Sequence, residues 1–352
     1  MGVPRYVPIL KGRRGEMDAL GKVRMRTRRA MVPLVEVTPR DESEDVAAIT
    51  RICDQTVERL ARAYGHPLML DGGHFDLRQD LGGGVGVVGL LAERARAAGL
   101  VAQPVLRLDD PDTARRDAGA AHAVDDRGLT VRLIGEDLEE DPDDLDAALQ
   151  DLLGDTGTGR ERVDLLLDLG PVEGDVAVRG GARLVLSLLR TLPEVTDWRT
   201  VTVAAGAFPV DLSQFTPNTI GERPRYDAQL FDQVRRRRLP RQPDYGDYAV
   251  AHPTLTLGGA YSPPPQLRYT ASEHWLVLKG HKRDPLAHRQ FHQICERIAA
   301  HPEFAGTPVG WADEKIARHS SEGPGNGTTW RTVGTAHHLD YVTLRLTTLG
   351  EP

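Results

Sequence analysis

The sequence predicts an α/β protein, a closed (β/α)8 TIM-like barrel with an additional C-terminal segment. Three observations favour this fold. Eight short aliphatic runs occur up to residue 252, and most are apolar at nearly every position, as in strands buried on both faces. Helical patterns separate these runs at intervals of roughly 25 to 45 residues, the spacing of strand–helix–strand units. No G-x-G-x-x-G follows the first run, which disfavours the main alternative, a doubly wound open sheet.

The predicted strands are rich in Val, Leu and Ile and end in polar or glycine-containing loops. Because aromatic residues make up only 5% of the chain, we expect a core of aliphatic side chains. In chain order the strands cover residues 6–10, 31–37, 67–71, 102–108, 129–134, 163–170, 200–208 and 247–252.

The predicted helices have apolar residues at helical spacing and recognisable ends. The pattern over 44–65 stops at a glycine, and the pattern over 141–154 begins with Asp141 and Pro142, a favourable helix entry. The other helical patterns, of which the first and third are weaker, cover residues 15–29, 85–99, 110–122, 180–192 and 225–238.

The pattern changes after residue 252, so we divide the chain into a barrel over 1–255 and a C-terminal segment over 256–352. The elements predicted for this segment are a proline- and glycine-rich crossing (256–270), an alternating strand (274–280) and three helices (288–301, 311–320 and 333–346). The first of these helices is a candidate for the eighth barrel helix. We expect the segment to complete or cover one end of the barrel.

Composition disfavours several classes of protein. The formal net charge of −7 argues against a general nucleic-acid-binding surface. Only two cysteines occur, Cys53 and Cys295, and we expect both in the core of a protein from a reducing cytoplasm. The first residues lack the apolar centre of a signal peptide, and no run reaches the ~18 apolar residues of a membrane span.

Charged and polar side chains stand at the ends of the predicted strands. Because the C-terminal ends of barrel strands meet at one mouth, we expect these side chains to converge there. They are Lys11, Glu36, Asp71, Arg107, Arg132, Glu136, Asp168 and His252.

The sequence leaves three arrangements of these side chains open. The acids and bases could pair in a structural network, since their charges nearly balance. They could form a site for an anionic or polar ligand, with bases as anion partners. The acids could also bind a divalent cation such as Mg²⁺ or Mn²⁺. No HExxH, CxxC, GxSxG or Walker motif selects among these. The catalytic candidates are Glu36, Asp71 and Asp168, and the ligand-binding candidates are Lys11, Arg107, Arg132 and His252.

The stretch TTWRTVGTAHHLDYVTL (328–344) carries a second set of candidates. Its adjacent histidines point about 100° apart on a helix, so only one can face a given site. If the stretch reaches the mouth, Asn326 offers a hydrogen-bonding amide, Trp330 a stacking face and His338 an acid or base. The same histidine could instead be a hydrogen-bonded core residue.

Several segments carry a family resemblance when they are taken together. They are YVPILKGRRGEMDAL, VPLVEVTP, LMLD, LRL, LLLDLG, GDYAVAHP, LRYT, WLVLKG and GNGTTWRTVGTAHHLDYV, between Tyr6 and about Leu346. This set resembles the family named after the beta protein of T-even bacteriophages. The resemblance implies a bacterial or phage protein, sometimes associated with antiviral gene clusters, and it supplies no catalytic residues.

Two functions therefore compete. The first is a hydrolase or lyase that acts on a small polar or phosphorylated, nucleotide-like ligand at the barrel mouth, with or without a metal ion. The second is a non-enzymatic module that binds a partner protein in phage–host conflict, because barrels host many functions. Three carboxylates around one point without a paired cation would favour the metal enzyme, and complete ion pairing would favour the module.

Overall fold

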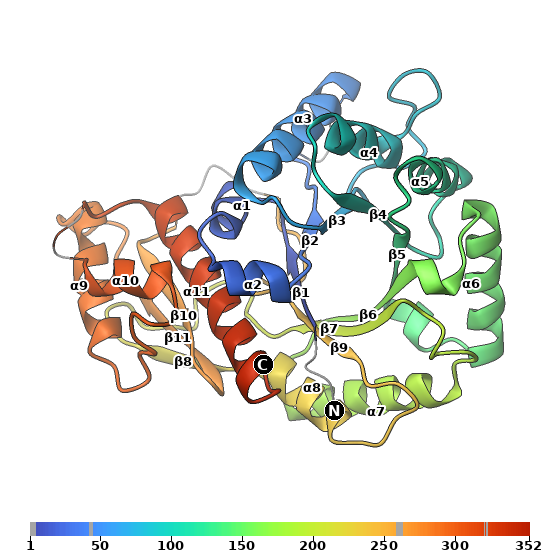
Figure 1. Cartoon of the computed structure of the whole chain (residues 1–352). Helices are drawn as coiled ribbons and strands as arrows, with labels where there is room; N and C mark the ends of the chain where they lie inside the picture. Colours follow the sequence, from blue (N-terminus) through green and yellow to red (C-terminus); the bar gives the residue numbers. More distant parts are fainter. Residues whose placement is uncertain (1–4, 42–44, 258–262, 320, 322) are drawn as a thin grey trace.

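The main body of the protein is a closed barrel of eight parallel strands surrounded by helices (Figure 1). The computed structural model describes residues 5–41, 45–257, 263–319, 321 and 323–352. The strands follow one another around the barrel in chain order, and the last pairs with the first. They are β1 (Tyr6–Leu10), β2 (Leu34–Glu36), β3 (Leu68–Asp71), β4 (Ala102–Leu106), β5 (Leu129–Ile134), β6 (Val163–Pro171), β7 (Thr200–Gly206) and β9 (Asp244–Asp247). The predicted barrel is confirmed.

The eighth barrel strand differs from the prediction. The apolar run at 247–252 suggested a strand there, but β9 covers Asp244–Asp247 and the chain turns away afterwards. The sequence of β9 is polar. Its outward-facing side chains, Tyr245 and Asp247, are nevertheless buried, because hydrogen bonds satisfy their polar groups. The apolar run at 247–252 therefore does not coincide with the residues that form the last strand.

The barrel helices lie outside the strands at the predicted places, with ends shifted by a few residues (Figure 1). Two short helices replace the single pattern predicted over 15–29. They and the others are α1 (Arg14–Leu20), α2 (Met25–Ala30), α3 (Val46–Ala63), α4 (Val87–Ala97), α5 (Asp112–Asp125), α6 (Pro142–Thr156), α7 (Asp175–Thr191) and α8 (Tyr226–Arg235). Short 3₁₀ helices cover Gly135–Leu138, Arg160–Arg162 and Ala287–Arg289.

The C-terminal residues build a three-stranded antiparallel sheet and three helices beside the barrel (Figure 1). The sheet has the order β10 (Gln266–Thr270), β11 (His274–Lys279) and β8 (Gly221–Pro224), so one of its strands comes from the connection between β7 and α8. The helices are α9 (Gln290–Ala299), α10 (Trp311–Ala317) and α11 (Gly327–Thr348). The crossing predicted at 256–270 lies partly outside the described residues. The division at residue 255 stays a prediction.

Helix α11 packs against the barrel where α9 was expected. It lies along α1 and α2, whereas α9 packs on the C-terminal sheet (Figure 1). The contact is close, because a Cβ atom on Gly15 of α1 would come within 2.8 Å of the Arg331 side chain. On α2, the Thr27 hydroxyl donates a hydrogen bond of 2.5 Å to Asp340 Oδ1 of α11. These contacts fasten the C-terminal residues to the barrel wall.

The core has the aliphatic composition that the sequence predicts. One cluster fills the barrel interior with Val, Ile, Leu and Met side chains, and a larger one lies between the strands and the helices. Cys53 and Cys295 are both buried and free. Among the helices of the described residues, none has the length and apolarity needed to cross a membrane.

Candidate active site

Six charged side chains converge at the C-terminal ends of the barrel strands, which we call the mouth. The parallel register places Glu36 of β2 level with Asp71 of β3, and Arg132 of β5 contacts both of them and Asp168 of β6, so these acids form one buried layer. We call the six residues the strand-end cluster. They are Lys11, Glu36, Asp71, Arg107, Arg132 and Asp168.

Arg132 is the centre of the strand-end cluster. Its Nη1 donates to Glu36 Oε1 at 2.9 Å and to Asp71 Oδ2 at 2.6 Å. Its Nε and Nη2 donate to Asp168 Oδ2 at 2.9 and 2.7 Å, and Nη2 also donates to the Tyr248 hydroxyl at 2.7 Å. The side chain is only 5% exposed. One guanidinium thus binds all three acids, a use of its fixed donor geometry that a lysine could not reproduce.

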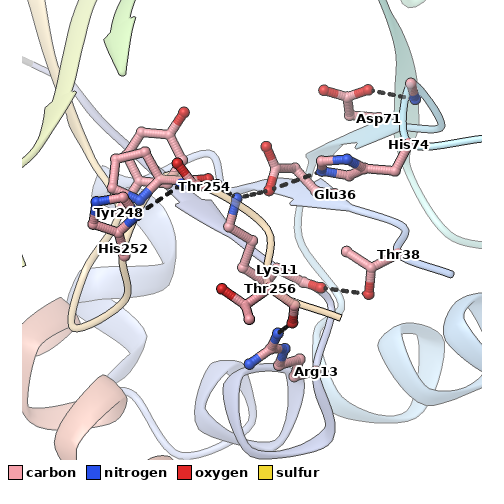
Figure 2. Close-up of polar contacts among 12 residues, drawn as sticks. Lys11, Arg13, Glu36, Thr38, Asp71, His74, Tyr248, His252, Thr254 and Thr256 are labelled. Atoms are coloured by element: carbon pink, nitrogen blue, oxygen red, sulfur yellow. Dashed lines mark hydrogen bonds and ion pairs between the residues drawn. The ribbon is translucent and has the colours of Figure 1, made fainter. Parts of the chain in front are cut away.

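Lys11 binds the opposite side of Glu36. Its Nζ lies 2.7 Å from Glu36 Oε2, donates to the carbonyl oxygen of Pro253, and stands 5.1 Å from the centre of the Tyr248 ring (Figure 2). Burial alone would raise the pKa of Glu36, but His74, Arg132 and Lys11 outweigh burial and hold that pKa well below its usual value. Glu36 is therefore a carboxylate at neutral pH.

The accessible groups of the mouth lie around this buried layer, and we call them the rim. They are His74, Arg107 and His252. His74 is 23% exposed and places Nε2 at 3.5 Å from Glu36 Oε2. Arg107 is 12% exposed and donates to both oxygens of Asp71, at 3.2 and 2.8 Å. His252 stands across Lys11 from His74 (Figure 2), accepts a hydrogen bond from the Thr254 amide, and has its pKa lowered by burial.

The arrangement of the acids bears on the expected Mg²⁺ or Mn²⁺ site. In the part of the chain that the structure describes, no group of three or more His, Cys, Asp or Glu side chains is arranged to hold a metal ion. The guanidinium of Arg132 stands where a cation shared by the acids would lie. The geometry gives no support to a divalent cation bound by Glu36, Asp71 and Asp168.

His338 lies away from the mouth. It is fully buried between α11 and the barrel wall, with Nε2 at 2.8 Å from Asp247 Oδ2 and Nδ1 at 2.8 Å from Thr270 Oγ1. Its neighbour His337 is bonded to Asp313 and to the Thr270 carbonyl. Both imidazoles therefore connect α11 to other elements, which matches the core alternative left open above.

Asn326 and Trp330 lie at the start of α11. The Asn326 side chain accepts a hydrogen bond from the Thr329 amide and caps the helix. The Trp330 ring stacks on Phe291 with centroids 5.3 Å apart, and its Nε1 donates to the Pro324 carbonyl. Trp330 is 3% exposed, so its faces are used in packing. Neither residue is hydrogen-bonded or stacked on a residue of the strand-end cluster.

Sequence reasoning overlooked two residues of the mouth. Tyr248 donates a hydrogen bond of 2.5 Å to Asp168 and was hidden by the shifted position of the last strand. His74 follows β3 in the turn DGGH, and the glycine pair after a strand-end aspartate was the signal that could have identified it.

A model of the Beta protein family matches residues 6–344 of the sequence. The chain belongs to the Beta protein family. No curated protein matches the sequence. The family assignment therefore covers the barrel and the C-terminal elements together, as the sequence resemblance implied.

Solved structures similar to this Beta protein family member include barrel enzymes. Phosphonopyruvate hydrolase complexed with oxalate and Mg²⁺ is 11% identical with a TM-score of 0.37 and covers 70% of this chain and 76% of its own. Triosephosphate isomerase from Bartonella henselae is 13% identical with a TM-score of 0.35 and covers 70% and 92%. The carboxyl transferase domain of Rhizobium etli pyruvate carboxylase is 10% identical with a TM-score of 0.39 and covers 97% and 49%. These likenesses carry no argument about function.

Two opposing pH effects are expected from the buried carboxyl groups. Neighbouring cations lower the pKa values of Glu36 and Asp71 against burial. Stability from these groups is present above their unfolded pKa values, near 4, and is lost as pH falls through the lower folded values. Burial raises the pKa of Asp110 to about 6, so its charging destabilises the folded state at higher pH.

We therefore expect the free energy of unfolding to rise slightly from pH 7 to pH 5 and to fall below about pH 4. Urea denaturation over this range measures the profile. The Asp110→Asn variant should lose part of the rise and keep the fall, because burial also raises the pKa values of Asp137, Asp232, Asp244 and Asp340. A free energy of unfolding that stays constant down to pH 3 would contradict the ion pairing of the acids.

Proposed function

We propose that this protein is an enzyme, a hydrolase or lyase that acts on a small polar or phosphorylated molecule at the barrel mouth. The buried layer of the strand-end cluster fixes the positions of the rim groups above it. Arg107 supplies positive charge to an anionic group of the ligand. His74 acts as the acid or base, because an imidazole ring can both donate and accept a proton.

The observation that carries the proposal is the pair formed by His74 and Glu36. The imidazole of His74 is partly exposed, and its buried Nε2 lies 3.5 Å from a buried carboxylate that nearby cations keep ionised. A carboxylate in this place orients the ring. Burying three acids and three bases costs free energy that aliphatic side chains would not cost, which suits a functional site better than a purely structural one.

Replacement of His74 tests the enzyme proposal. A thermal-shift screen of small phosphorylated compounds identifies ligands, and ³¹P NMR then follows their conversion. We expect His74→Ala to lower turnover by about 10²- to 10⁴-fold, the usual contribution of a general acid or base. The melting temperature should stay close to that of the wild type, because His74 is partly exposed and borders the network at one point.

His66→Ala is the matched control, since His66 precedes β3 at the other end of the barrel. Turnover should be unchanged in this variant. Asp71 cannot serve for the test, because it is fully buried and its loss would disturb both arginines. Equal turnover in His74→Ala and the wild type would remove His74 from the mechanism.

A non-enzymatic module in phage–host conflict is the second candidate, and the ion pairing of all three acids favours it. The two proposals differ in phage infection of bacteria that express the protein. If protection depends on chemistry at the mouth, His74→Ala abolishes it. If the protein protects by binding a partner protein elsewhere, His74→Ala protects as well as the wild type.

A further inference from the structure

A pocket rich in arginine lies between the barrel and the C-terminal elements. It has a volume of about 470 Å³ and receives residues from α1, from the chain after β9, from β10 and from the start of α11. Four of its described lining residues are arginines, and none is acidic. They are Arg13, Arg14, Arg268 and Arg331. The pocket shares no lining residue with the strand-end cluster.

Two of these arginines are partly buried and have no ionic partner among the described residues. Arg268 Nη1 donates to the Val250 carbonyl at 2.5 Å, and Arg331 Nη1 donates to the same carbonyl at 3.2 Å. Among the described residues, neither guanidinium lies within 4.0 Å of a carboxylate oxygen, whereas Arg132 contacts three acids. Arg268 also stands 4.4 Å from the centre of the Phe208 ring. Most donors of both guanidinium groups therefore stay available to a ligand.

The two charges lie unfavourably close together. Burial, followed by the charge of Arg331, lowers the pKa of Arg268, and burial likewise lowers the pKa of Arg331. Glu16 supplies the opposing charge that acts on both guanidinium groups, and its Oε2 accepts a hydrogen bond of 2.8 Å from the Lys11 amide. Two cations that share one carbonyl in a partly dehydrated pocket leave an excess of positive charge that an anion would neutralise.

The first turn of α11 adds to the same field. Asn326, Gly327 and Thr328 line the pocket at the N-terminal end of this helix of 22 residues. Asn326 caps the Thr329 amide, whereas the amides of Gly327 and Thr328 belong to a first helical turn, whose amides have no intrahelical partners and carry the positive end of the helix dipole. Forked guanidinium groups and helix N-termini both match the oxygen atoms of phosphate.

We propose that this pocket binds the phosphate group of a small phosphorylated ligand through Arg268, Arg331 and the first turn of α11. The proposal does not depend on catalysis at the barrel mouth. The volume admits more than one phosphate group, so inorganic pyrophosphate is a suitable probe.

Calorimetric titration of the full chain with inorganic pyrophosphate, at constant ionic strength, tests the proposal. We expect saturable binding by the wild type and at least about tenfold weaker binding by Arg268→Gln and by Arg331→Gln, from the loss of charge-assisted hydrogen bonds. The unliganded variants should melt at or above the wild-type temperature, because each loses an uncompensated buried charge. If one of these variants fails to fold, Arg331→Lys replaces it in the test. This variant keeps the positive charge but loses the forked donors of the guanidinium, so we expect partly weakened binding.

Two controls locate the bound anion. Arg183→Gln removes the same charge from an exposed position on α7 and should bind pyrophosphate as the wild type does. Arg107→Gln removes the anion partner proposed at the mouth and should keep the separate binding event that Arg268→Gln and Arg331→Gln weaken. Loss of binding in Arg107→Gln but not in Arg331→Gln would place the anion at the mouth and overturn the inference. Absence of binding by the wild type would overturn it as well.

Discussion

Replacing Arg132 with methionine is expected to lower the free energy of unfolding by about 3–5 kcal/mol, the usual cost of leaving buried charges without their partner. Arg132 is the shared partner of Glu36, Asp71 and Asp168, and all three acids are at most 2% exposed. Without the guanidinium, three carboxylates face one another inside the barrel. Lys11 and Arg107 reach only two of them, so Asp168 loses its only cation among the described residues.

Chemical denaturation measures this loss, and two further variants identify its cause. Arg183→Met changes an exposed arginine and should alter stability by less than about 0.5 kcal/mol. Adding Asp168→Asn to Arg132→Met should recover part of the loss, because the added change removes an unpaired charge. A small effect of Arg132→Met, or a double variant less stable than the single one, would show that the acids do not depend on Arg132.

Replacing Asp247 with alanine is expected to cost a similar amount, about 3–5 kcal/mol. Asp247 ends β9, is 1% exposed, and accepts hydrogen bonds from the Tyr6 and Tyr245 hydroxyls at 2.7 and 2.9 Å. It also binds His338 of α11 and lies 3.9 Å from the buried Arg225. Burial alone would raise the pKa of Asp247, but His338 and then Arg225 outweigh burial and lower it to about 2. Its removal breaks the hydrogen bond between α11 and β9.

Hydrogen exchange distinguishes this effect from a general loss of stability. Amide protection in α11 should fall more than protection in α3 to α6, because His338 is the point where α11 is bonded to β9. Asp54→Ala is the control, since Asp54 forms a half-exposed pair with Arg94 and such pairs contribute about 0–1 kcal/mol. Equal loss of protection throughout the chain would argue against a specific connection between Asp247 and α11.

The sequence was sufficient for most of the fold. The strands β1 to β7 are buried on both faces, and their continuous apolar runs recorded this directly. The strand β9 was misplaced because Tyr245 and Asp247 are buried by hydrogen bonding, which apolarity does not report. The place of α11 beside α1 depends on contacts between residues far apart in the sequence, such as Thr27 and Asp340. Local periodicity does not report such contacts.

The sequence was sufficient to predict which strand-end residues converge at the site. It was not sufficient to predict which of them bond to one another. The parallel barrel requires strand ends to meet, so the convergence of Glu36, Asp71 and Asp168 with Arg132 followed from position alone. The choice between ion pairs and a cation site depends on side-chain direction, which the sequence does not give. Arg268 and Arg331 were missed because the hairpin and helix that bring them together are far apart in the chain.

A crystal structure of the protein grown in orthophosphate tests the central claim most directly, namely that the strand-end cluster is organised around Arg132 beneath an accessible rim. We expect the Arg132 guanidinium within hydrogen-bonding distance of Glu36, Asp71 and Asp168, with phosphate bound by His74 and Arg107. An Arg132 side chain turned away from these acids, or a mouth that binds no phosphate at saturating concentration, would contradict the account.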